Sequence, residues 1–194
     1  MRRIRLEKHR LEYAERMSEL SADPAVKDTL GLIAEQVSVE GTREYIKFML
    51  AAEGKGTFYS RVILDENSEL IGVTTLKEID PEKKTTHIGS WLGKPYWGKG
   101  YNELAKAEIL KAAFIDLGLD YVFAGAKKEN VRSLKAQEKL PYITLGVEAD
   151  FPEELEKLEL ETGSPCVLNV FEKGKFLKWW EEQEEELANP VSEV

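Results

Sequence analysis

Two glycines are separated by one lysine in the segment Trp97-Gly98-Lys99-Gly100-Tyr101. Because glycine has no Cβ, Gly98 and Gly100 let main-chain N–H groups point into one small concavity. The apolar residues within 102–117 fall on one helical stripe, so a helix is expected to start after this loop and to add the partial positive charge of its N-terminus. The loop therefore predicts a phosphate or pyrophosphate site, with a structural turn before a helix as the alternative.

The order of elements around the loop narrows the kind of phosphate site. Residues 85–93 alternate like a strand, residues 120–126 form the next expected strand, and a second helix is expected over 130–139. Glu103 occupies the third glycine place of the dinucleotide-binding pattern, and no Gly-Lys-Ser/Thr follows an earlier glycine at the Walker spacing. Nucleotide hydrolysis is therefore disfavoured.

Three short motifs lie in this stretch of the chain. They are Ile88-Gly89-Ser90-Trp91-Leu92-Gly93, Tyr96-Trp97-Gly98-Lys99-Gly100-Tyr101, and Asn130-x-x-Ser133 followed by Glu138-Lys139-Leu140. Together they resemble the GNAT N-acetyltransferases, and within them the branch of RimJ/RimL-type ribosomal-protein and small-amine acetyltransferases. The resemblance covers residues 1–150.

The resemblance implies acetyl-CoA as the cosubstrate. In that family the glycine loop binds the pyrophosphate, the preceding strand pairs by its backbone with the pantetheine, and the Asn-x-x-Ser helix closes the thioester end. The residues that it implies for the cofactor channel are Trp91, Leu92, Gly98, Lys99, Gly100, Tyr101, Asn102, Asn130 and Ser133.

The implied reaction is direct transfer, in which an amine loses a proton, attacks the thioester carbonyl and passes through a tetrahedral oxyanion. We favour His87 as the general base, because an unperturbed histidine has a pKa of about 6.5 and accepts a proton at neutral pH. Many relatives carry Glu at that place. A hydrogen-bonded strand histidine without a catalytic role is one alternative, and the other candidate bases are Glu148, Asp150 and Glu153.

The departing thiolate needs an acid and the oxyanion needs a donor. The family motif places Ser133 as the acid, and Tyr142 is the second candidate. Ser133 could also cap its helix. A backbone amide at or near Leu92 is the expected oxyanion donor.

The implied fold is α/β, or α+β: a mixed, mostly antiparallel sheet of six to seven strands flanked by helices. Strands are expected at 3–6, 57–64, 69–77, 143–148 and 166–171, besides the two named above. Helices are expected at 9–20, after the Asp23-Pro24 start signal, after Gly41-Thr42, at 151–163 and beyond Lys173. The chain is predicted to form a single GNAT domain over 1–194, with 173–194 as a C-terminal helix and acidic tail.

Composition excludes several classes of protein. No apolar run approaches the ~20 residues of a membrane span, and the N-terminus lacks a signal-peptide core, which predicts a cytoplasmic protein. Cys166 is the only cysteine, so neither a disulfide nor a structural zinc site is expected, and no metal is predicted. The net charge of −9 argues against nucleic acid and favours cationic acceptors.

The sequence therefore predicts an N-acetyltransferase that transfers the acetyl group of acetyl-CoA to a primary amine. The acceptor could be a protein N-terminus, a ribosomal protein or a small cationic amine. Two alternatives are a non-catalytic acyl-CoA-binding sensor and a structural partner protein whose terminal helix mediates assembly. Monomer and homodimer both stay open.

Overall fold

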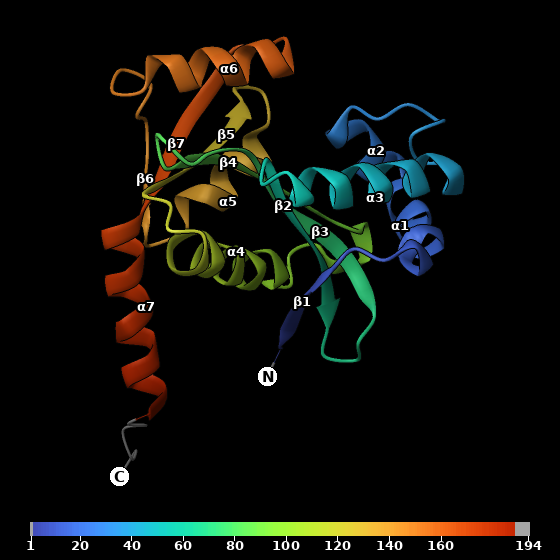
Figure 1. Cartoon of the computed structure of the whole chain (residues 1–194), viewed down its shortest axis with the longest axis horizontal. Helices are drawn as coiled ribbons and strands as arrows, with labels where there is room; N and C mark the ends of the chain where they lie inside the picture. Colours follow the sequence, from blue (N-terminus) through green and yellow to red (C-terminus); the bar gives the residue numbers. More distant parts are fainter. Residues whose placement is uncertain (1, 189–194) are drawn as a thin grey trace. The chain divides into compact units, whose positions relative to one another are not determined.

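The computed structural model describes residues 2–188 and contains a seven-stranded sheet in the order β1-β2-β3-β4-β5-β7-β6 (Figure 1). The parallel ladder pairs Thr85–His87 of β4 with Tyr121–Phe123 of β5, and the other described ladders are antiparallel. The expected mixed, mostly antiparallel sheet flanked by helices is confirmed. The strands are β1 Ile4–Lys8, β2 Phe58–Asp65, β3 Leu70–Asp80, β4 Thr85–Leu92, β5 Tyr121–Lys127, β6 Ile143–Thr144 and β7 Cys166–Glu172.

Seven α-helices are described among residues 2–188. They are α1 Ala14–Ser21, α2 Pro24–Leu30, α3 Val39–Gly54, α4 Tyr101–Lys111, α5 Val131–Glu138, α6 Pro152–Thr162 and α7 Lys173–Ala188. None of the helices in this part of the chain is long and apolar enough to cross a membrane. The chain divides into two compact units: unit 1 is Met1–Asp80 with Ile88–Ala112, and unit 2 is Pro81–His87 with Ala113–Val194. The single-domain organisation stays a prediction.

Unit 1 has apolar side chains on both faces of its strands. Val62 and Leu64 pack in one cluster with Met17 of α1 and Ile46 of α3. Ile63, between them on β2, packs in the other cluster with residues of α4. This alternation is what a strand buried on both faces requires, because successive side chains point to opposite sides.

Two helix starts in unit 1 show how local signals acted. The Asp23 carboxylate accepts a hydrogen bond from the Ala25 amide at 2.9 Å, so the predicted cap of α2 is confirmed. The prediction that Gly41 precedes α3 is wrong, since the helix begins at Val39 and Ser38 caps it. Gly41 lies in the first turn, and this position requires glycine because a Cβ there would lie 2.0 Å from the Glu35 carbonyl oxygen.

Two helices of unit 2, α6 and α7, contact β7. The side chains of Leu158 on α6 and Phe123 on β5 share a buried cluster with Cys166. Phe176 on α7 contacts the rings of Phe114 and Tyr142 instead. The expected terminal helix is present as α7, and residues 189–194 of the predicted acidic tail lie outside the described part.

Three predicted elements end earlier than expected or change type. The strand over 143–148 is wrong beyond Thr144, because Gly146 adopts a φ of +66° and its amide donates to the Asn169 side chain. The helix over 102–117 is α-helical only to Lys111 and then forms a π-helical turn over Ala112–Asp116. The helix over 9–20 begins as a 3₁₀ turn at Leu11–Tyr13.

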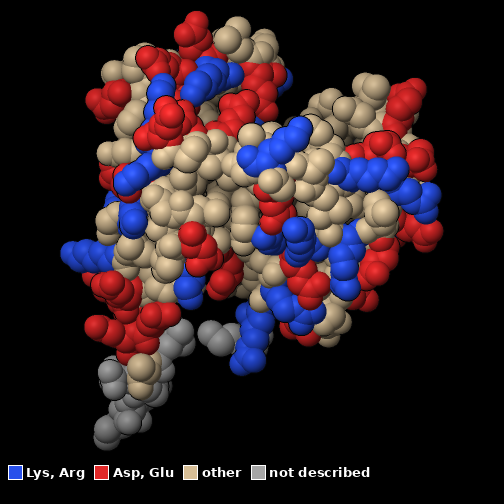
Figure 2. All heavy atoms as spheres, viewed as in Figure 1, with Lys and Arg blue, Asp and Glu red and all other residues tan. Residues whose placement is uncertain are grey.

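Acidic side chains lie on the outer surfaces of α6 and α7, as Figure 2 shows. The run Glu181–Glu186 belongs to α7, and its carboxylates are exposed. This run is therefore a solvated helix face over the residues that the structure describes.

Candidate functional site

The loop before α4 has the backbone geometry that an anion site needs. Gly98 and Gly100 adopt φ values of +68° and +84°, a left-handed conformation that side chains with a Cβ rarely tolerate. A Cβ built on either glycine finds no atom within 4 Å, so the space above the loop is open. Gly100 is the N-cap of α4, and no side chain caps this helix start among the described residues. The first amides of α4 are thus left to bind a ligand.

Aromatic residues anchor the loop at both ends. The Trp97 indole donates to the Leu92 carbonyl at 2.7 Å, and Arg16 donates to the Tyr96 hydroxyl at 3.0 Å. The Tyr101 ring is buried, and its hydroxyl donates to the Glu66 carboxylate at 3.0 Å. Burial, with the Glu66 charge beside it, raises the pKa of Tyr101. These contacts hold the ends of the loop while its middle stays exposed.

Along the chain, Lys99 directly precedes Gly100 and Asn102 follows it by two positions. The Lys99 side chain is exposed, its ammonium lies 5.8 Å from the centre of the Tyr96 ring, and its carbonyl accepts a hydrogen bond from Arg2. Asn102 lies half-buried in the first turn of α4. The main-chain N–H of Lys99 stays a candidate donor for the predicted phosphate, and its ammonium lies over the Tyr96 ring.

The end of β4 precedes this loop and places Trp91 and Leu92 on opposite faces. Leu92 is buried with Tyr101, whereas Trp91 is half-buried against the cluster that contains Met17. Gly72 permits close contact with β3 here, because a Cβ on it would lie 2.2 Å from the Trp91 carbonyl oxygen. Unit 1 thus contains seven of the nine predicted cofactor residues, which lie at one strand end, in one loop and in the first turn of α4: Trp91, Leu92, Gly98, Lys99, Gly100, Tyr101 and Asn102.

The Asn130–Ser133 motif forms the start of α5 in unit 2. The Asn130 side chain accepts a hydrogen bond from the Ser133 amide at 3.2 Å and so caps the helix. The Ser133 hydroxyl accepts from Gln137 at 3.4 Å, and the Gln137 carbonyl oxygen accepts from Asn169 at 2.8 Å. Capping is therefore done by Asn130, and the Ser133 hydroxyl keeps its own proton available for donation.

Tyr142 lies in a cluster of aromatic rings. Its ring centre is 4.3 Å from that of Trp179 and 5.2 Å from that of Phe176, and only 2% of the residue is exposed. This packing is typical of a core residue. Its role as an acid stays a prediction, and the surroundings favour Ser133.

His87 lies near the middle of β4 and is buried. Its Nε2 is 2.8 Å from the Glu154 carboxylate on α6, and its ring lies 5.4 Å from Phe123. The second oxygen of Glu154 accepts from Lys157 at 2.9 Å. Burial by itself raises the pKa of Glu154, but the hydrogen bonds from His87 and Lys157 outweigh it and the pKa is lowered.

An ionised Glu154 decides which nitrogen of His87 carries the proton. A carboxylate can only accept, so Nε2 must be the donor in this pair. The lone pair of the neutral ring is then on Nδ1. A carboxylate that holds one imidazole nitrogen in this way also stabilises the imidazolium formed when the ring takes up a proton.

Sequence reasoning missed Glu154 and considered its neighbours instead. Glu153 is exposed and pairs with Lys83 at 3.0 Å, Asp150 is exposed, and Glu148 accepts from the Leu168 amide at 3.0 Å. The spacing of residues in this helix could have indicated Glu154. It precedes Leu158 by one helical turn and so lies on the same buried face as that core leucine, where a carboxylate needs a hydrogen-bonding or charged partner.

The chain is similar to known acetyltransferases both in sequence and in structure. Residues 3–142 match the family described as an acetyltransferase (GNAT) domain. A protein of Bacillus licheniformis, named "Uncharacterized N-acetyltransferase p20", is 30% identical over 151 residues, which cover 77% of this chain and 84% of that protein.

Solved structures of other acetyltransferases share this fold. A putative acetyltransferase from T. thermophilus has a TM-score of 0.71 at 24% identity and covers 95% of this chain and 93% of its own. The microcin C7 self-immunity acetyltransferase MccE, solved with acetyl-CoA and AMP, has a TM-score of 0.68 at 22% identity and covers 87% of this chain and 90% of its own.

The matched family supports the enzyme prediction over the sensor and the structural partner. It is a family that uses acetyl-CoA. Since the match spans more than half of the sequence, this chain belongs to the GNAT acetyltransferases and is an N-acetyltransferase enzyme.

Proposed function

We propose that this enzyme acetylates a primary amine by direct attack on acetyl-CoA and belongs to the RimJ/RimL-like branch of its family. The acceptor class comprises protein N-termini, ribosomal proteins and small cationic amines. The observation that carries the proposal is the open loop at Gly98 and Gly100, whose backbone leads into the uncapped start of α4.

The cofactor is proposed to bind by its pyrophosphate at the amides of 98–101. An anion at this place satisfies orphan N–H groups and the positive end of the helix dipole together. The strand end at Trp91 and Leu92 precedes the loop, and a backbone amide at or near Leu92 is proposed to donate to the oxyanion. Asn102, Asn130 and Ser133 complete the proposed set of cofactor residues.

His87 is proposed as the general base. Nδ1 of the neutral ring accepts the proton that the ammonium or the attacking amine loses, and the new N–C bond forms at the thioester carbonyl. The imidazolium that results keeps its ion pair with Glu154, 2.8 Å away. The C–S bond then breaks, and Ser133 is proposed to protonate the coenzyme A thiolate, with Tyr142 as the second candidate.

The first experiment measures thiol release from acetyl-CoA with a panel of primary amines, against a control without acceptor. We expect release above that control with at least one amine. An absence of acceptor-dependent release across protein N-terminal peptides, polyamines and amino-acid amides would contradict the proposed activity.

The second experiment tests the cofactor loop by substituting Gly100→Val. A branched side chain at this place both strains a backbone with φ of +84° and blocks approach to the amides, so we expect a loss of more than about 1 kcal/mol of acetyl-CoA affinity by calorimetry. Gly56→Val is the matched control, because Gly56 also lies in unit 1 with a φ of +74° and open space around it. Equal affinities of the two variants would contradict the loop assignment.

A further inference from the structure

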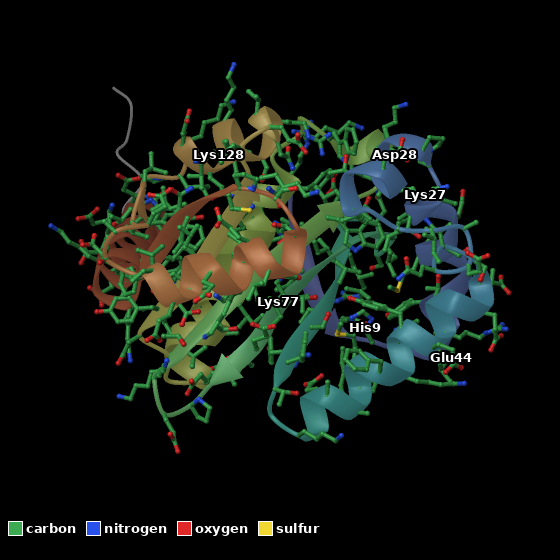
Figure 3. The ribbon with its side chains drawn as sticks, turned by 90° about the horizontal axis from the view of Figure 1, so that it is seen from above. His9, Lys27, Asp28, Glu44, Lys77 and Lys128 are labelled. Atoms are coloured by element: carbon green, nitrogen blue, oxygen red, sulfur yellow. The ribbon has the colours of Figure 1, made fainter. Side chains whose placement is uncertain are left out.

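A pocket of about 520 Å³ lies within unit 1. Its walls come from α1, α2, the chain between α2 and α3, α3 itself and the end of β4. Figure 3 shows α2, which carries Lys27 and Asp28, and α3, which carries Glu44. The volume is in the range of pockets that bind small molecules, which is about 300–1,000 Å³.

Large apolar side chains line this pocket. They are Met17, Leu30, Leu32, Tyr45, Phe48 and Trp91. Leu30, Leu32 and Trp91 are only half-buried, and 56% of Phe48 is exposed. Covering such surface with an apolar group is favourable by about 25 cal/mol per Å².

Polar groups of the wall are few, and several already have partners. The Ser21 hydroxyl donates to the Ser18 carbonyl at 3.3 Å, and the Tyr45 hydroxyl shares hydrogen bonds with Ser60 and Thr75. Glu44 is the one charged residue of the described lining, and its carboxylate lies 2.6 Å from the Lys47 ammonium. A polyamine with several ammonium groups would find one partly neutralised carboxylate here.

The pocket reaches the proposed cofactor strand through Trp91. This residue belongs to the lining and directly precedes Leu92, whose amide is the proposed oxyanion donor. An amine whose body fills the pocket therefore lies beside the strand that the thioester is proposed to follow. Three aromatic rings in the wall favour an aromatic or branched aliphatic body.

We infer that this pocket selects the acceptor, and that the acceptor is a primary amine on an apolar body, such as the α-amino group of a hydrophobic amino acid whose carboxylate is blocked. The inference rests on the proposed function and deepens it. It narrows the acceptor from cationic amines in general to those that carry a single ammonium and an apolar side chain.

The experiment compares leucinamide and phenylalaninamide with serinamide and spermidine as acceptors, measured by thiol release. We expect kcat/KM for the two apolar amides to exceed that for serinamide about tenfold or more, which is the usual scale for an apolar pocket. Serinamide or spermidine equal to or better than the apolar amides would overturn the inference.

Leu32→Ser and Ile33→Ser form a matched pair of variants. Both residues lie in the chain between α2 and α3, but Leu32 lines the pocket, whereas Ile33 is 59% exposed and is not among the described lining residues. We expect Leu32→Ser to lower the ratio of leucinamide to serinamide kcat/KM about fivefold, and Ile33→Ser to leave it unchanged. Equal ratios in the two variants would overturn the inference.

A binding measurement separates this inference from the proposed function. Phenylalaninamide is titrated calorimetrically into the wild type and into Leu32→Ser, each saturated with coenzyme A. Binding that weakens in the variant supports the pocket even where no amine releases thiol, a result that would contradict only the proposed activity. Absent or equal binding would overturn the pocket assignment even where another amine is acetylated.

Discussion

The chain has two histidines, one in each unit, and both are buried but have different partners. In unit 1, His9 bonds through Nε2 to the Ser60 hydroxyl at 2.8 Å, and its Nδ1 is buried without a hydrogen-bond partner among the described residues; Figure 3 shows it beside α3. In unit 2, His87 bonds through Nε2 to the Glu154 carboxylate at the same distance.

The difference shows that the partner, rather than burial, decides what a buried histidine can do. Burial, together with the nearby Arg61 charge, lowers the pKa of His9 to about 4. With a hydroxyl in place of a carboxylate as its hydrogen-bond partner, His9 is held neutral and serves packing. A carboxylate offers His87 a counter-charge, so that ring can take up a proton without leaving an unpaired charge in the core.

The largest expected effect concerns stability and His9. Its pKa is lowered in the folded state, so unfolding takes up a proton between about pH 6.5 and 4. The free energy of unfolding therefore falls by about 3 kcal/mol as the pH is lowered through that range. His9→Gln should remove this part of the pH dependence, as measured by urea unfolding at several pH values. Equal pH dependence in the wild type and the variant would contradict the neutral assignment.

The second expected effect concerns catalysis and His87. His87→Ala should lower kcat for amine acetylation about 10²-fold or more and leave acetyl-CoA affinity nearly unchanged, as expected for the loss of a general base. His9→Gln is the control for removing a buried histidine and should change kcat less than about twofold. A fall of less than about threefold in His87→Ala would move the base role to a carboxylate.

A smaller effect is expected from the partner of His87. Glu154→Gln should lower kcat about tenfold, because the imidazolium loses its anionic partner. Glu153→Gln is the matched control, since its exposed side chain pairs with Lys83 instead. If both variants showed the wild-type kcat, Glu154 would have no positioning role.

The smallest expected effect comes from salt and separates surface charge from the buried pair. With a net charge of −9, the protein should attract a cationic acceptor. Raising the ionic strength should therefore lower kcat/KM, because at about 0.15 M salt the interaction between exposed charges is screened beyond a distance of about 8 Å. The side chains of His87 and Glu154 are 6% and 7% exposed, so kcat should change little. A salt-independent kcat/KM would contradict steering, and a strongly salt-dependent kcat would contradict a buried pair.

Features that depend on neighbouring residues were predictable from the sequence. The Asp23 cap of α2, the glycine loop ahead of α4 and the start of α5 each follow from groups within a few positions of one another, although Asn130 caps α5 in place of Ser133. The sheet class followed from the alternation of apolar residues and from the family resemblance. Predictions failed where a distant segment intervened, as in the strand expected over 143–148, which ends at Thr144 because the Gly146 amide bonds to the Asn169 side chain.

The sequence by itself determined which residue types were available: two glycines that free backbone amides, one histidine in the strand before them, and an acidic, apolar-rich chain able to bury a core. Only the tertiary structure decided which groups meet. Glu154 lies 67 positions from His87 along the chain, and the pocket at Trp91 is lined by segments from residue 17 onward. Such contacts depend on how helices pack on strands, which local spacing does not encode, whereas a cap or a glycine turn is complete within its own few residues.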